Sequence, residues 1–128
     1  MFENTDLGKL IVRLMLGGLL LFHGIAKLFN GIGFIESQLA SHNLPAILAF
    51  GVYIGEVVAP LMVILGYHTR VGAVIIIINM VVAIALVHSH QLLSLAGNGG
   101  WALELQGFFL FSAVAVLFLG PGRYKLKN

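Results

Sequence analysis

Residues 71–87 of the chain read VGAVIIIINMVVAIALV, an apolar stretch that contains no charged side chain. Its runs of β-branched residues would also suit a buried β-strand. Inside a lipid bilayer, however, an unpaired strand would leave its backbone N–H and C=O groups without hydrogen-bond partners, whereas a helix pairs these groups within itself. The stretch therefore predicts a transmembrane helix and an all-α fold.

The composition of the whole chain points the same way. Of its 128 residues, 59% are hydrophobic and 9% are charged, against about 45–50% and about 25% in soluble domains. These polar side chains are too few to cover a water-facing globule, which excludes the soluble, disordered and fibrous classes. The absence of cysteine excludes disulfides and thiolate metal sites. The lysines and arginines are scattered and no aromatic platform accompanies them, so we expect no nucleic acid as a partner.

Four stretches of the chain approach the roughly 20 apolar residues that a transmembrane helix needs. They cover residues 10–29, 45–65, 71–87 and 101–119. Turn-forming residues follow the first, second and fourth stretches, at Asn30-Gly31, Gly66-Tyr67-His68 and Gly120-Pro121-Gly122. We therefore predict an integral membrane four-helix bundle that forms a single four-span domain over residues 1–128.

The connections between the spans differ in length. Residues 66–70 leave room only for a tight turn, so the second and third spans should form an antiparallel hairpin. In residues 30–44, apolar side chains recur at helical spacing beside polar ones, which suits a short helix at the membrane surface. An irregular polar loop is the alternative there. Residues 88–100 are rich in His, Ser, Gly and Asn and predict a flexible outer loop.

Lysine and arginine residues near the span ends predict the orientation, because cytoplasmic loops carry an excess of them. Only Lys27 falls toward the outer side. The others fall on the opposite side: Lys9, Arg13, Arg70, Arg123, Lys125 and Lys127. This bias predicts a multi-pass protein of the cytoplasmic (inner) membrane with both termini cytoplasmic. The first stretch lacks a small-residue cleavage site, so we expect it to remain as a span.

Ionisable side chains inside the spans are the first candidates for function, because each costs roughly 2.5–3.5 kcal/mol on insertion scales. At about 100° per residue, Arg13, His23 and Lys27 share one stripe of the first span, and that stripe should face the bundle interior. Snorkelling of Arg13 and Lys27 to opposite membrane surfaces is the alternative. His23 lies too deep for snorkelling, and we expect it to form an interior hydrogen bond.

Glu56 lies close to the middle of the second span, among small residues that recur every four positions and permit close helix contact. Pro60 has no N–H group, so the carbonyl of Glu56 loses its helical partner. We expect the Glu56 side chain to face the bundle interior, within reach of His23 or Arg13. Asn79 in the third span has the right depth to join it, although a single buried Asn also serves simply to hold helices together.

Glu104, at the start of the fourth span, matches Lys27 in depth, and we expect the two to form an ion pair. His88 and His90 flank one serine, but no cysteine or acidic cluster completes a metal site with them. No attachment motif supports a haem on His23 and His88. We predict no metal and assign no catalytic residue. The candidate ligand-binding residues are Arg13, His23, Lys27, Glu56, Asn79 and Glu104.

With these residues identified, the chain resembles the DoxX family of small four-span membrane proteins. The resemblance covers nearly the whole length. It rests on Arg13-Leu14 with FHGIAKL (residues 22–28), Gly55-Glu56 with Leu65-Gly66 and Thr69-Arg70, Asn79-Met80 with Ala83, and Glu104 with GPGRY (residues 120–124). It implies a four-helix bundle in the cytoplasmic membrane, with structural or binding roles for Arg13, His23, Lys27, Glu56 and Glu104. Some relatives are small subunits of quinone-linked sulfur-oxidising oxidoreductases, and others associate with redox-stress enzymes.

Three functions stay open at this point. The first is an accessory subunit of a quinone-linked oxidoreductase or redox-stress complex, in which His23, Lys27 and Glu56 would bind a quinone and a partner subunit would carry the redox centre. The second is a carrier or channel for protons or a small solute, which with so few spans would call for a homo-oligomer. The third is a structural or assembly factor without chemistry of its own. The lipid bilayer is a partner in all three.

Overall fold

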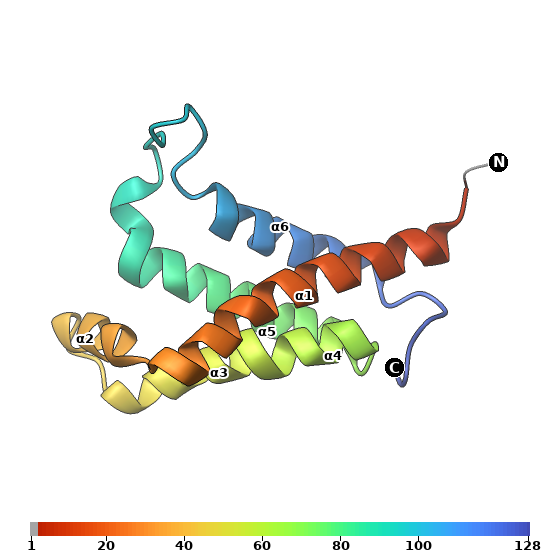
Figure 1. Ribbon diagram of the computed structural model, residues 1–128, viewed down its shortest axis with the longest axis horizontal. Coiled ribbons are helices and arrows are strands. Elements are labelled where there is room, and N and C mark those ends of the chain that lie inside the picture. The colour runs from red at the N-terminus through yellow and green to blue at the C-terminus, as the bar shows by residue number, and fades with distance from the viewer. Residues whose placement is uncertain (1–2) are drawn as a thin grey trace.

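The structure, a computed structural model, describes residues 3–128 apart from the side chains of residues 87 and 88. Within that range the chain is helical, without β-strands, as the sequence predicts. Long helices lie side by side in Figure 1, and a short helix, α2, lies at one end. In chain order the elements are α1 (Thr5–Asn30), α2 (Gly33–Ser41), η1 (Ala46–Phe50), α3 (Gly51–Tyr53), η2 (Ile54–Val58), α4 (Ala59–Leu65), α5 (Thr69–Ala83), η3 (Ile84–His88), η4 (Ser89–Gln91) and α6 (Glu104–Leu119).

Within the described part of the chain, three helical segments are long and apolar enough to cross a membrane: Thr5–Asn30, Ala46–Leu65 and Thr69–Leu86. The fourth predicted stretch gives a shorter helix, because residues 101–103 form the turn that leads into α6. At about 1.5 Å per residue, the 16 residues of α6 extend about 24 Å, less than the hydrocarbon core of about 30 Å. The helical character of all four stretches is thus confirmed, while α6 falls short of full span length.

The second span combines several helical geometries. A 3₁₀ helix, η1, opens it and is followed by α3, a π-helical turn, η2, and then α4. Pro60 explains the π turn, because it has no N–H to donate to the carbonyl of Glu56. The N–H of Ala59 reaches back five residues to the carbonyl of Ile54, the spacing of a π-helix. The proline therefore does not break the helix. It widens the helix for one turn, the turn that contains Glu56.

Glycines bring α1 into direct contact with the second span. A Cβ atom at Gly24 would lie 1.9 Å from the carbonyl oxygen of Glu56, and one at Gly17 would lie 2.8 Å from that of Pro60. Only a residue without a side chain allows two helix backbones to approach so closely. The carbonyl of Glu56, to which Pro60 cannot donate, thus lies against Gly24 of α1.

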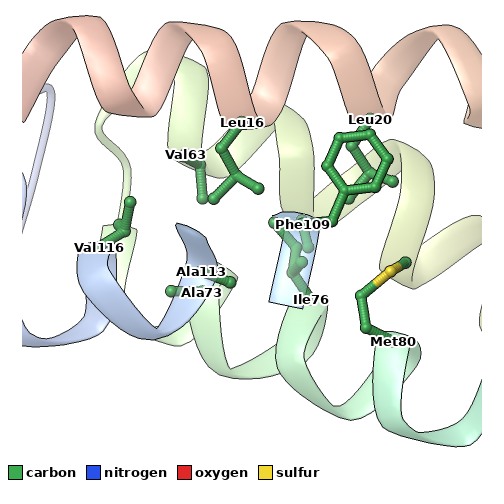
Figure 2. Close-up of a cluster of buried hydrophobic side chains, with 10 residues drawn as sticks. Leu16, Leu20, Val63, Ala73, Ile76, Met80, Phe109, Ala113 and Val116 are labelled. Carbon is green, nitrogen blue, oxygen red and sulfur yellow. The ribbon is translucent and has the colours of Figure 1, made fainter. Parts of the chain in front are cut away.

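The main hydrophobic core lies where α1, α4, α5 and α6 meet (Figure 2). Its buried members are Leu16, Leu20, Ala59, Val63, Ala73, Ile76, Met80, Phe109, Ala113 and Val116. A second, smaller core of Ile32, Leu39 and Ala49 lies beneath α2. The helical alternative for residues 30–44 is therefore correct for α2, and the apolar side of this short helix covers the end of the second span.

Many large apolar side chains point outward, and the aromatic ones show this most clearly. Phe29 and Phe118 are 85% and 80% exposed. A soluble monomer rarely exposes such extensive apolar surface, whereas lipid tails solvate it without cost. The outward face of the helices is therefore the surface that contacts lipid.

Both termini lie at the same end of the molecule (Figure 1). The tight turn after α4 contains two residues with left-handed backbone, Gly66 and His68, and sends α5 back alongside α4. After α6 the chain continues past this turn, where the N–H of His68 donates to the carbonyl of Lys127 over 2.8 Å. The C-terminal segment, residues 120–128, is thus fastened to the α4–α5 turn.

Candidate functional site

Lys27 of α1 and Glu56 of η2 form an ion pair between Nζ and Oε1. Glu56 is 5% exposed, so its carboxylate lies inside the bundle, as the sequence predicts. The other carboxylate oxygen, Oε2, accepts a hydrogen bond of 3.2 Å from the Nδ2 amide of Asn79 on α5. These three residues, the polar cluster, connect three helical segments through one carboxylate.

Small residues allow the polar cluster to assemble. A Cβ atom at Gly55 would lie 2.5–2.7 Å from side-chain atoms of Asn79, so Asn79 reaches Glu56 only because position 55 has no side chain. On the other side, Gly24 brings α1 close enough for Lys27 to turn inward. The hydroxyl of Tyr53 adds a contact, donating to the carbonyl of Lys27 over 3.3 Å. The snorkelling alternative for Lys27 is therefore wrong, because its ammonium group binds a buried carboxylate.

A cleft of about 190 Å³ opens beside the ion pair. We call it the polar cleft, since its lining includes His23, Lys27, Glu56 and Gln106. The remaining walls are apolar: Leu20, Phe34, Ile35, Met80, Ala83, Leu105 and Phe109. A few polar groups set among apolar walls are a common feature of small-molecule sites.

His23 presents its ring to the polar cleft. The imidazole packs edge-on against the ring of Phe109, with 5.6 Å between centroids and an interplanar angle of 83°. In the part of the chain that the structure describes, no group forms a hydrogen bond with this imidazole, so the interior hydrogen bond expected for His23 is not seen. Its ring nitrogens are therefore available to a ligand in the cleft.

A larger cavity of about 600 Å³ lies beneath α2. Its described lining comes from α2, the connection after it, the second span, α5 and η3, and Asn79 is the one side chain with a polar group among these described residues. We call it the apolar cavity. Ile35 lines both this cavity and the polar cleft, so the two spaces are neighbours.

Arg13 lies apart from the polar cluster. Its guanidinium donates to four backbone carbonyls, those of Val63 and Ile64 at the end of α4 and those of Pro121 and Tyr124 in the C-terminal segment. The side chain is 1% exposed, so Arg13 does not snorkel either. Carbonyls in the last turn of a helix are short of backbone donors. Arg13 supplies a donor to Ile64 and a second donor to Val63, whose carbonyl also accepts from the N–H of Gly66 over 3.3 Å. Neither His23 nor Glu56 is its partner.

The expected ion pair between Lys27 and Glu104 is wrong, because Lys27 binds Glu56 instead. Glu104 is exposed at the start of α6, and its Oε2 lies beside the backbone of Gly100 in the preceding loop. Of the six candidate residues, the structure therefore brings together His23, Lys27, Glu56 and Asn79, and it separates Arg13 and Glu104 from them.

Two residues near the cleft were not among the sequence candidates. Gln106 lines the cleft from α6, and its place three residues before Phe109, on the same helix face, is the signal that could have identified it. Tyr53, three residues before Glu56, could have been found by the same spacing. Among the described residues, no three His, Asp or Glu side chains gather as a metal site would require. The side chain of His88 lies outside the described residues, so the prediction for His88 and His90 stays a prediction.

The sequence model of the DoxX family matches residues 8–89, well over half of the chain. No curated protein and no solved structure matches the chain. The matched region contains the whole polar cluster, His23 and Arg13, whereas Glu104 and residues 120–124, which also carried the resemblance, follow it. The chain belongs to the DoxX family, and its long apolar helices make it an integral membrane protein.

Proposed function

We propose that this protein is an accessory subunit of a quinone-linked membrane oxidoreductase or redox-stress complex, and that it binds the quinone head group in the polar cleft. The observation that carries the proposal is the accessible imidazole of His23 beside the Lys27–Glu56 ion pair, in a cleft whose other walls are mainly apolar. The redox centre that exchanges electrons with the quinone would belong to a partner subunit.

The donor groups of the cleft suit a quinone. A quinone presents two carbonyl oxygens that accept hydrogen bonds, and the ammonium group of Lys27 has three N–H donors. One of them is directed at Glu56, which leaves donors for a ligand. His23 offers a second donor from the same helix. Since Glu56 balances the charge of Lys27, the cleft can receive a neutral head group without an isolated charge.

In this proposal residues 1–128 form one four-span domain in the cytoplasmic membrane, with both termini in the cytoplasm. The shared position of the termini supports an even number of crossings (Figure 1). Basic side chains gather at that end, where Lys9 packs beside Gly122 and Arg70 beside Gly120, as the positive-inside rule requires of a cytoplasmic face. Local thinning of the bilayer would accommodate the short helix α6.

A purely structural role is the second candidate, and one observation favours it. Both carboxylate oxygens of Glu56 already have partners within the chain, Lys27 and Asn79. A cluster that is satisfied internally holds helices together without any ligand. The two candidates differ at His23, which the structural role does not need.

Equilibrium binding of a quinone to the detergent-purified protein tests the proposal. We expect His23→Leu to weaken binding at least tenfold while leaving thermal unfolding unchanged, because the imidazole holds no other part of the chain by a hydrogen bond in the described structure. His90→Leu is the matched control, since His90 is exposed in η4, away from the cleft lining. Undiminished binding by His23→Leu would leave the structural role as the better account.

A further inference from the structure

We infer that the ligand is a long-tailed quinone whose isoprenoid tail lies in the apolar cavity while its head group occupies the polar cleft. This inference rests on the proposed function and adds the class of ligand to it. It assigns a use to the apolar cavity, which the head-group proposal leaves unexplained.

The polar cleft and the apolar cavity differ in size. Sites for whole small molecules usually enclose about 300–1,000 Å³. The polar cleft, at about 190 Å³, is below this range and fits only part of such a molecule. The apolar cavity, at about 600 Å³, falls within the range, and its described lining offers a single polar side chain. Each space therefore suits one portion of an amphiphile.

The wall of the apolar cavity suits a hydrocarbon chain. Among the described residues, the side chains around it are aliphatic except for Asn79, and two glycines complete the wall. Its lining consists of Ile35, Leu39, Leu44, Leu48, Gly51, Val52, Ile54, Gly55, Ile75, Ile78, Asn79, Val82, Ala85 and Leu86. Aliphatic walls of this kind bind a hydrocarbon chain through apolar burial, at about 0.8 kcal/mol for each CH₂ group.

The polar cleft and the apolar cavity lie next to each other. Ile35 of α2 contributes to both linings. Asn79 lines the cavity while its amide donates to Glu56, which lines the cleft. A molecule with its head near Lys27 would thus have the apolar cavity next to it, beyond Ile35, as a place for its tail. This adjacency favours the tail of the same quinone over an acyl chain of a separate lipid.

Gly51 gives a direct test, because it lines the cavity and nothing lies within 4 Å of a Cβ built there. Its backbone is in the right-handed helical region, with φ −57° and ψ −26°, so Gly51→Leu fills the cavity without straining the chain. Gly18→Leu is the matched control. Gly18 also has nothing within 4 Å, and it lines neither space. Ala85→Leu, on the η3 side of the cavity, is a second filling variant.

The measurement is equilibrium binding of two naphthoquinones, one with an isoprenoid tail and one with a methyl group in its place, and of the matching benzoquinone pair. One of the two tailed quinones will bind the unmodified protein more tightly than the other. We expect the affinity for that quinone to be at least tenfold higher than the affinity for its own tail-less analogue. Gly51→Leu and Ala85→Leu should remove this advantage without affecting the tail-less quinone, and Gly18→Leu should change neither.

Each contrary result has a distinct meaning. Equal affinity for tailed and tail-less quinones would overturn the tail site while leaving the head-group proposal intact. Equal binding of the tailed quinone by Gly51→Leu and the unmodified protein would overturn it as well. Failure of every quinone to bind the unmodified protein would overturn the proposed function and the tail site together.

Discussion

Lys27 and Glu56, 29 positions apart in the sequence, form an ion pair between α1 and the π-helical turn of the second span. The carboxylate is buried, while the lysine side chain keeps 29% of its surface exposed and lines the polar cleft. The pair therefore holds two helices together, and in the proposed function it also presents a charged donor to the quinone.

Removing one partner of this pair should destabilise the bundle. Lys27→Met leaves the buried carboxylate of Glu56 with Asn79 alone, and loss of one partner of a buried pair costs up to about 3–5 kcal/mol, less where a partner is part-exposed as here. We expect a loss of about 2 kcal/mol in the free energy of unfolding, measured by thermal denaturation in detergent. The double variant Lys27→Met/Glu56→Gln should recover part of it, and a double variant less stable than Lys27→Met would contradict the pairing.

Gly24→Ala should be among the most damaging of small substitutions. Its Cβ atom would lie 1.9 Å from the carbonyl oxygen of Glu56, so α1 and the second span must separate, and overpacking of this kind costs about 1–3 kcal/mol. Thermal denaturation checks the loss. Gly18→Ala is the control, because nothing lies within 4 Å of its Cβ position. Equal stability of the two variants would show that α1 does not pack through Gly24.

Arg13→Lys should release the C-terminal segment without unfolding the bundle. A lysine cannot reproduce the planar fork that reaches four carbonyls at once. Hydrogen exchange of the backbone amides of residues 122–127 should become faster. Arg70→Lys is the control, since exposed Arg70 donates to one carbonyl, that of Leu117. If these amides exchange equally slowly in Arg13→Lys, Arg13 does not hold the C-terminal segment against the end of α4.

Single-cysteine labelling tests the orientation, because the chain has no native cysteine. An impermeant thiol reagent added outside intact cells should label cysteines placed at Ser41 and Asn98. It should label cysteines at His68 and Lys127 only after the membrane is opened. Labelling of position 68 in intact cells would show that the α4–α5 turn faces outward, which contradicts the proposed orientation.

The helices were predictable from sequence because their signals are local. Long apolar runs end at turn-forming residues, and the resulting helices begin and end within a few positions of the predicted boundaries. The meeting of Glu56 with Asn79 was also predictable, since both lie at mid-span and a buried polar group needs a partner.

The partner of Lys27 was not predictable, because depth in the membrane does not fix which neighbouring helix a side chain faces. Glu104 and Glu56 were both within plausible reach of it, and the close approach of α1 to the second span at Gly24 decides in favour of Glu56. Arg13 was misassigned for a similar reason. Nothing local indicates that the C-terminal segment passes the end of α4, where its carbonyls meet the guanidinium.

Photo-crosslinking with a quinone that carries an azido group on its ring tests the central claim, head-group binding in the polar cleft, most directly. Mass spectrometry of the irradiated protein should place the label on side chains that line the cleft, such as His23, Lys27 and Gln106, and excess unlabelled quinone should suppress it. Label spread over lipid-facing side chains such as Phe118, without competition by unlabelled quinone, would contradict the claim.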